Sequence, residues 1–231
     1  MRALLYADWC LLRNTIVRYL GVCMIIVIPI VGMTNADASA APGVMAASMF
    51  TAMLSFYAML GLFGSDEQGD WEQMRLALPV TPRLVVRERY AFLVLVSLAI
   101  ALTGTVVGML TNAILSAFAA LNVPRGVLEV AGGALGAAVI ALAYLALMMP
   151  YVFKVGMTKA RITFSLPFML CLLLNVGPVR DVVMGLGNAL QRLEASLGSP
   201  APIFAAIVVA TAVLYVVSMR ISERIYARRD F

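Results

Sequence analysis

The side chains that could carry chemistry in this sequence are few, and they lie outside its long apolar runs. The 231 residues contain no histidine, and the three cysteines, Cys10, Cys23 and Cys171, are far apart. Zinc and iron sites use such ligands in clusters, so the sequence indicates neither a metal centre nor a disulfide framework. The apolar runs contain no paired carboxylates and no activated nucleophile, which argues against an intramembrane hydrolase.

Charged residues gather instead in two segments. The first polar segment, residues 65–90, holds nine of the charged residues in a chain with 17 basic and 12 acidic side chains. The second polar segment, residues 150–161, contains Lys154, Lys159 and Arg161. Each segment lies between long apolar runs, so any chemistry or binding is expected in these two segments.

The composition is that of an integral membrane protein. Hydrophobic residues make up 63%, charged residues 13%, and the mean hydropathy is +0.96. A soluble domain of this size could not cover so much apolar surface. Continuous apolar runs of about 20 residues fit membrane helices and not the shorter alternating strands of a barrel. No basic run is interleaved with aromatic residues, so the net charge of +5 indicates membrane topology and not nucleic-acid binding.

These runs predict an all-α integral membrane protein, a single transmembrane domain with six transmembrane helices. We expect an N-terminal interfacial helix with Trp9 at headgroup level, and an amphipathic outer helix before the last span. Two glycine pairs, Gly104 with Gly108 and Gly132 with Gly136, either seat a neighbouring helix or reflect the general frequency of glycine in spans. The predicted spans are residues 16–34, 40–63, 90–118, 128–149, 162–178 and 202–220.

The distribution of basic residues predicts the orientation. With the N-terminus inside, fourteen basic residues fall on the cytoplasmic side, and Arg125, Arg180 and Arg192 fall outside. Basic residues are retained on the cytoplasmic side of membrane proteins. We therefore predict a multi-pass membrane protein with both termini in the cytoplasm, and both polar segments there too.

The first polar segment predicts two helices separated by a break. Asp70 can cap a short helix, which Pro79 ends. Thr81 and Pro82 then provide an N-cap and a proline at the first helical position, so a second helix can continue through Arg83 into the third span. One face of the short helix carries Trp71, Met74, Arg75 and Leu78.

Two interpretations of the short helix remain open on these grounds. It can receive a push from a cytosolic partner and pass it into the membrane helices. Alternatively, it can lie on the inner leaflet with its arginines near lipid phosphates. Between their charged flanks the six apolar runs contain no Asp, Glu, Lys, Arg or His, so an energy source for transport would have to act from outside the spans.

Two motifs resemble a known family. Residues 70–90, D-W-E-Q-M-R-L-A-L-P-V-T-P-R-x-V-V-x-x-R-Y, are similar to an acidic-Trp-Glu segment followed by Ser-Leu-Pro-Val, with Ala77 in place of serine. Residues 150–161, P-Y-V-F-K-V-G-M-T-K-A-R, are similar to a loop before the fifth helix, with Ala160 in place of glycine. On these residues the chain resembles, over nearly its whole length, the type 2 ABC exporter permeases, six-span subunits that work with a separate ATP-binding cassette protein.

The resemblance implies the permease subunit of an ATP-driven exporter that moves a peptide-like or amphipathic substrate out of the cell. It implies an ABC ATPase as partner, together with a second copy of the chain or a related permease. The chain has no P-loop motif, so it is expected to bind no cofactor itself, with ATP and Mg on the partner. The implied ATPase-coupling residues are Asp70, Trp71, Met74, Arg75, Leu78 and Arg83, and the second cytoplasmic loop contributes Phe153, Lys154, Lys159 and Arg161.

Other functions are weighed beside the exporter. The alternative is a non-transporting membrane scaffold or a toxin-immunity protein, which an ATPase gene next to this one would argue against. An enzyme ranks third because no catalytic constellation is present. The substrate stays open among amphipathic peptides, drugs and lipids, and the choice between homodimer and heterodimer stays open as well.

Overall fold

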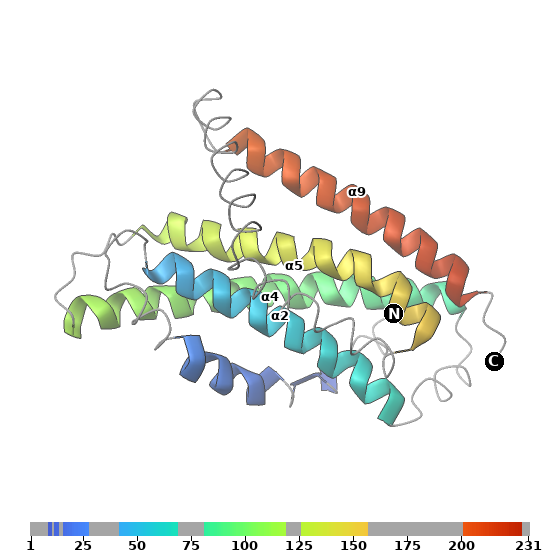
Figure 1. Cartoon of the computed structure of the whole chain (residues 1–231), viewed down its shortest axis with the longest axis horizontal. Coiled ribbons are helices and arrows are strands. Elements are labelled where there is room, and N and C mark those ends of the chain that lie inside the picture. Colours follow the sequence, from blue (N-terminus) through green and yellow to red (C-terminus); the bar gives the residue numbers. More distant parts are fainter. Residues whose placement is uncertain are drawn as a thin grey trace, which may run out of the picture.

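The chain forms long helices in the part that the computed structural model describes, which comprises residues 9–10, 12–13, 16–27, 42–68, 81–118, 126–156 and 201–227. Four long helices dominate this part (Figure 1). A shorter apolar helix, Ile16–Val27, precedes them. The long helices are α2 (Pro42–Gln68), α4 (Pro82–Phe118), α5 (Val127–Val155) and α9 (Ala201–Tyr226).

All four long helices are long and apolar enough to cross a membrane. The prediction of an all-α membrane protein is therefore confirmed. Ile16–Val27 covers the first part of the predicted first span. The predicted fifth span, the amphipathic outer helix and most of the N-terminal interfacial helix lie outside the described residues, so the number of six spans stays a prediction.

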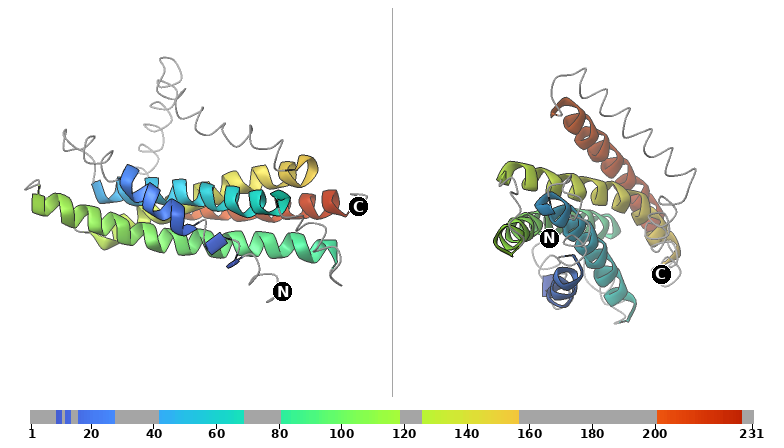
Figure 2. Two further views of the ribbon diagram at one scale, coloured as in Figure 1. Left: turned by 90° about the horizontal axis from the view of Figure 1, so that it is seen from below. Right: turned by 60° about the vertical axis from the view of Figure 1, so that its left-hand side comes forward.

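Helices α2, α4 and α5 pack on one another, and α9 packs on α5 and α4. Figures 1 and 2 show that α9 meets α4 and α5 near its C-terminal end and diverges from them toward its N-terminal end. The ends of α2, α5 and α9 and the start of α4 lie at the same end of the bundle (Figure 1). We call this the polar end, because the charged residues that flank the apolar runs are found there.

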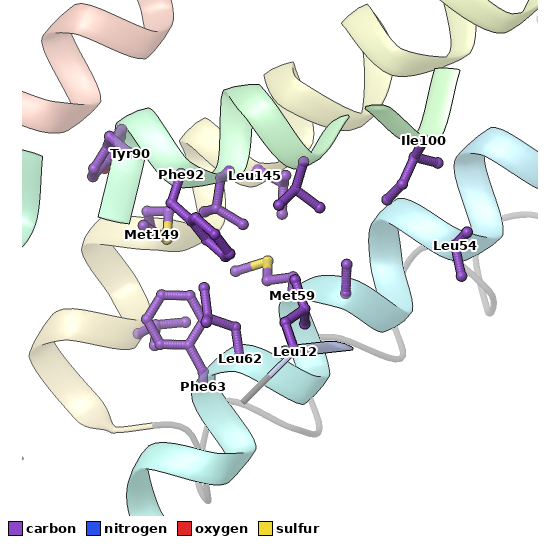
Figure 3. Packing of buried hydrophobic residues seen from close by; sticks show 14 of the residues in the cluster. Leu12, Leu54, Met59, Leu62, Phe63, Tyr90, Phe92, Ile100, Leu145 and Met149 are labelled. Carbon is purple, nitrogen blue, oxygen red and sulfur yellow. The ribbon is translucent and has the colours of Figure 1, made fainter. Parts of the chain in front are cut away.

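The core lies between α2, α4 and α5, with Leu12 from the N-terminal region packed against it (Figure 3). Its largest members are fully buried, as expected where helices meet face to face. They include Phe50, Leu54, Met59 and Leu62 of α2, Tyr90 and Leu93 of α4, and Met149 of α5.

Helices α2 and α4 approach closely at two glycines. A Cβ atom at Gly104 would clash with Thr51 of α2, and one at Gly108 would clash with the backbone carbonyl of Gly43. The predicted role of this pair in seating a neighbouring helix is therefore confirmed. The second pair differs, because a Cβ at Gly132 or Gly136 would meet nothing within 4 Å in the described part of the chain.

Two helix boundaries bear directly on the sequence analysis. Helix α4 begins at Pro82, and the carbonyl of Thr81 accepts a hydrogen bond from the N–H of Leu84 at 2.9 Å, so the predicted start of this helix is confirmed. The end of α5 differs from our expectation that Pro150 closes the fourth run. Helix α5 continues through Pro150 and ends before Gly156, whose φ of 85° suits glycine.

Candidate functional site

The polar end brings together three of the residues predicted to act in coupling. Arg83 is exposed in the first turn of α4, Lys154 is exposed in the last turn of α5, and Phe153 beside it is buried. The other predicted site residues lie outside the described part, and their roles stay predictions. These are Asp70, Trp71, Met74, Arg75, Leu78, Lys159 and Arg161.

Phe153 joins three helices through aromatic contacts. Its ring meets the ring of Phe63 on α2 edge-on, with centroids 6.1 Å apart, and the ring of Tyr226 on α9, with centroids 5.5 Å apart. The guanidinium of Arg89 on α4 lies 5.3 Å from the centroid of the Phe63 ring. This arrangement favours a cation–π interaction, and it ties α4 to the same aromatic cluster.

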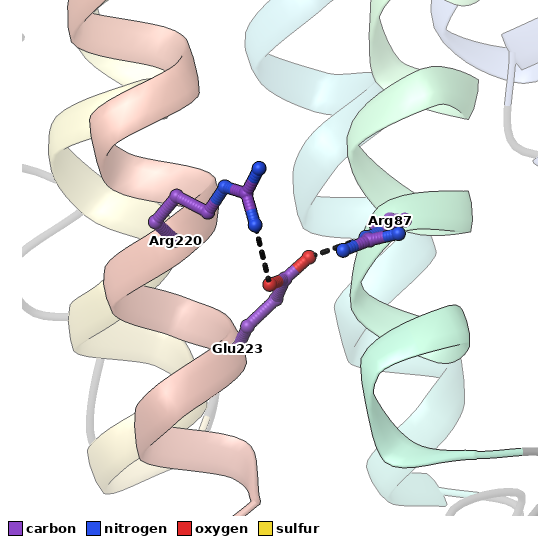
Figure 4. A network of polar contacts seen from close by, with 3 residues as sticks. All are labelled: Arg87, Arg220 and Glu223. Atoms are coloured by element: carbon purple, nitrogen blue, oxygen red, sulfur yellow. Dashed lines mark hydrogen bonds and ion pairs between the residues drawn. The ribbon is translucent and has the colours of Figure 1, made fainter.

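An ion pair links α4 to α9 across the polar end (Figure 4). Nε of Arg87 donates to Oε1 of Glu223 at 2.5 Å, and Nη1 of Arg220 lies 3.8 Å from Oε2 of the same carboxylate. The Glu223 side chain is 8% exposed, and that of Arg87 is 47% exposed. Glu223 is therefore held between its own helix and α4, with its carboxylate largely removed from solvent.

A chain of hydroxyl groups runs parallel to this ion pair. Oη of Tyr90 lies 2.7 Å from Oγ of Ser218 and 2.8 Å from Oγ of Ser222. Ser218 donates its single proton to the carbonyl oxygen of Ala146 on α5. Ser218 must then accept from Tyr90, and Tyr90 must accept from Ser222, because each hydroxyl has one proton to give. The chain Ser222 to Tyr90 to Ser218 to Ala146 thus connects α9, α4 and α5.

The carbonyl of Ala146 explains why α5 continues through a proline. Pro150 has no backbone N–H, so it cannot donate to the carbonyl four residues earlier, that of Ala146. A carbonyl left without a partner in a membrane helix is costly, and hydroxyls of neighbouring helices can satisfy it. Ser218 of α9 takes the place of the missing donor.

A second tyrosine reinforces the junction of α4 and α9. Oη of Tyr215 donates to the backbone carbonyl of Tyr90 at 2.8 Å, and the two rings meet edge-on with centroids 5.0 Å apart. Glu88 and Arg89 on the same turn of α4 are buried as well. The polar end is therefore a tightly connected region where charged, hydroxyl and aromatic groups lie together.

Farther along the bundle, α2 and α5 enclose an apolar groove of about 460 Å³. Met49, Met53 and Phe56 of α2 and Tyr144 of α5 line it, with Ser55 at its wall. Oη of Tyr144 and Oγ of Ser55 are buried without a hydrogen-bond partner in the described part of the chain. The groove thus offers an almost wholly hydrophobic surface, with the two hydroxyl groups buried in its wall.

The sequence analysis missed the face of α9 that makes these contacts. Ser218, Ser222, Glu223 and Tyr226 are the buried residues of this helix. Their spacing of four, one and three residues places them on one helical face, which was a readable signal. The predicted sixth span, residues 202–220, stops before three of these four residues.

Comparison with models of known protein families gives a match over nearly the whole chain. The family model described as "ABC-2 family transporter protein" matches residues 3–227. No curated protein and no solved structure gives a significant match. The described residues contain no group of three or more His, Cys, Asp or Glu side chains that could hold a metal ion. Because the family match spans nearly the whole chain, the protein belongs to the ABC-2 family of transporter proteins and is a multi-pass membrane permease of an ABC transporter.

Proposed function

We propose that this permease exports a peptide-like or amphipathic substrate across the plasma membrane, driven by a separate ABC ATPase that carries ATP and Mg. The permease acts with a second copy of itself or with a related permease. Its polar end and both termini face the cytoplasm. The short helix predicted between Asp70 and Pro79, which carries Trp71 and Leu78, makes the main contact with the ATPase together with Arg83. A secondary contact is formed by Phe153, Lys154, Lys159 and Arg161.

The orientation is supported by the position of the basic side chains. In α2, α4, α5 and α9, every basic residue lies at the polar end. The opposite ends of these helices carry one charged residue, Glu129. Basic residues collect on the cytoplasmic side of membrane proteins, so the polar end is the cytoplasmic one. The basic residues of the four helices are Arg83, Arg87, Arg89, Lys154, Arg220 and Arg224.

The observation that carries the proposal is that α4 is unbroken from its start and is joined to α9 by an ion pair and by hydrogen bonds. Helix α4 has 37 residues without a break, and it begins inside the first polar segment. At 1.5 Å per residue it is roughly 55 Å long, so a displacement at its start is carried deep into the bundle. The Arg87–Glu223 ion pair and the Tyr90 hydroxyl bonds pass the same displacement to α9.

The groove between α2 and α5 supports the substrate class. Ligand sites are mostly apolar with a few polar groups that fix orientation. The methionine and phenylalanine side chains of this groove suit the alkyl or aromatic part of an amphipathic substrate.

Co-purification tests the proposal. The chain is purified with candidate ABC ATPases from the same organism, and ATP hydrolysis is measured with and without the permease. Trp71→Ala and Leu78→Asp are expected to abolish both co-purification and the stimulation of hydrolysis, because they remove the apolar face of the coupling helix. Trp9→Ala is the matched control, since Trp9 is a tryptophan that is 47% exposed and lies outside this segment.

The readouts separate coupling from folding. Each variant must elute as a single species at the wild-type position in size-exclusion chromatography. Unchanged stimulation by both coupling variants would refute the docking proposal. If no ATPase binds the wild-type chain, the scaffold alternative gains support over the exporter.

A further inference from the structure

We propose that the polar end holds the phosphate group of one anionic phospholipid in a basic hollow between α4 and α9. The hollow has a volume of about 530 Å³ and is lined by Arg83 of α4 and by Arg220, Glu223, Arg224 and Ala227 at the end of α9. It lies away from the apolar groove, since the two share no lining residue. The inference requires a membrane but does not depend on the direction of transport.

The charges of the hollow leave room for an anion. Among the described residues that line it, the one carboxylate is that of Glu223, which already accepts from Arg87 and lies 3.8 Å from Arg220. Arg83 and Arg224 make no hydrogen bond or ion pair within the described part of the chain, and both are exposed. Several guanidinium groups therefore surround a single carboxylate that is already shared, and they repel one another until another anion binds.

Guanidinium groups are well suited to a phosphodiester. Their planar donors match phosphate oxygens in a bidentate geometry, and charge-assisted bonds of this kind are stronger than neutral ones. Arg83 approaches from α4, and Arg220 and Arg224 lie one helical turn apart on α9. A phosphate between them would be held from two helices at once.

The depth of the hollow identifies a lipid as the source of this phosphate. The apolar part of α9 ends at Met219, directly before Arg220. Arg220 and Arg224 follow directly, and long basic side chains near the ends of membrane helices reach toward the headgroups. Lipid phosphates occupy this depth, at the edge of the hydrocarbon core. Basic pockets between membrane helices on the cytoplasmic side are known to bind anionic headgroups.

Native mass spectrometry of the full chain tests the proposal. The protein is purified in an uncharged detergent and titrated with dioleoyl-phosphatidylglycerol or with dioleoyl-phosphatidylcholine, which has the same acyl chains and phosphodiester but a compensating positive charge. We expect one phosphatidylglycerol to remain bound at concentrations at which phosphatidylcholine dissociates. In the double variant R220Q/R224Q, the affinity for phosphatidylglycerol should fall by roughly 30-fold, because each arginine near the membrane surface contributes roughly fivefold to the affinity for an anionic lipid.

Two further variants separate the site from a folding defect. Arg224→Gln alone leaves the Arg87–Glu223 ion pair intact and should weaken binding roughly fivefold. Lys154→Gln removes an exposed charge at the same end but outside the hollow, and should leave binding unchanged. Equal binding of phosphatidylglycerol by wild type and R220Q/R224Q would overturn the proposal. So would an equal loss in Lys154→Gln, or displacement of the lipid by inorganic phosphate at the same concentration.

Discussion

Replacing Ser218 by alanine should destabilise the protein because of a proline on another helix. The substitution removes the donor that satisfies the carbonyl of Ala146, which Pro150 leaves without its helical partner. It also removes the acceptor of the Tyr90 hydroxyl. Ser218 is 4% exposed, so water cannot readily replace either bond.

The expected size follows from these two losses. Hydrogen bonds between membrane helices average about 0.6 kcal/mol by double-mutant cycles. A buried carbonyl left without a partner costs about 1–3 kcal/mol. We therefore expect Ser218→Ala to lower the free energy of unfolding by about 1–2 kcal/mol, which corresponds to a fall in Tm of roughly 2–8 °C for a chain of this length.

A second substitution isolates the cause. In a Pro150→Ala background, residue 150 regains an N–H that can donate to the carbonyl of Ala146, as in any helix. Ser218→Ala then loses only the bond with Tyr90, and its cost should fall to about 0.6 kcal/mol. The two positions should therefore be coupled by roughly 1 kcal/mol in a double-mutant cycle.

Thermal unfolding in detergent of the wild type, both single variants and the double variant provides the cycle. Ser116→Ala is the matched control, because the Ser116 hydroxyl bonds the carbonyl of Ala113 in its own helix and is exposed. It should change Tm little in either background. If Ser218→Ala costs the same with proline and with alanine at position 150, the carbonyl of Ala146 does not depend on Ser218 and the reasoning fails.

Three further predictions use the same unfolding assay. Gly108→Ala should lower the free energy of unfolding by about 1–3 kcal/mol, because its Cβ would clash with the facing backbone of α2. Gly132→Ala has open space around its Cβ and should be neutral or stabilising, so equal effects of the two substitutions would contradict this packing. Arg87→Glu should lower Tm, and adding Glu223→Arg should restore part of the loss by re-forming the ion pair with reversed charges. If the two substitutions lower Tm additively, the ion pair does not hold α4 to α9. Tyr144→Phe should leave Tm unchanged or raise it, since the Tyr144 hydroxyl is buried without a partner in the described residues. A fall in Tm would reveal a structural role for this hydroxyl.

Some of the fold could be read from local sequence because its cause is local. The start of α4 can be predicted from Thr81 and Pro82 alone. An N-cap residue followed by a proline with a fixed φ favours a helix start, and this preference does not depend on distant residues. The long apolar runs likewise predict membrane helices from their own composition. The Gly104 and Gly108 pair was readable as a contact, although its partner helix was not.

Other features could not be read because their cause lies on another helix. Pro150 has the local signature of a helix end, and α5 continues through it because Ser218, 68 residues later, supplies a donor. Gly132 and Gly136 have the spacing of a contact pair, yet the described structure places Gly133 against Val44 instead. Spacing gives the face of a helix, but which face meets a neighbour depends on how the bundle packs.

The candidate site shows the same division. The concentration of charge at residues 65–90 and 150–161 was visible in sequence, and Arg83, Phe153 and Lys154 do lie together at the polar end. The pairing of Arg87 with Glu223 joins residues 136 positions apart, so no local pattern could reveal it. The four-residue interval between Ser218 and Ser222 indicated a polar helix face, but not that Tyr90 would lie between them.

The contacts that hold α9 are polar because lipid gives apolar contacts little advantage. Apolar side chains lose nothing by facing acyl chains, so association of membrane helices depends on close packing and hydrogen bonds. Helix α9 follows this rule, since its buried residues are two serines, a glutamate and a tyrosine in its last three turns, while Val209, Val213 and Val217 stay exposed in the described part of the molecule. Its position is therefore fixed at the polar end, where α4 begins and where the first polar segment ends. A force applied at that segment therefore acts on the contacts between α4 and α9 before it reaches residues deeper in the membrane.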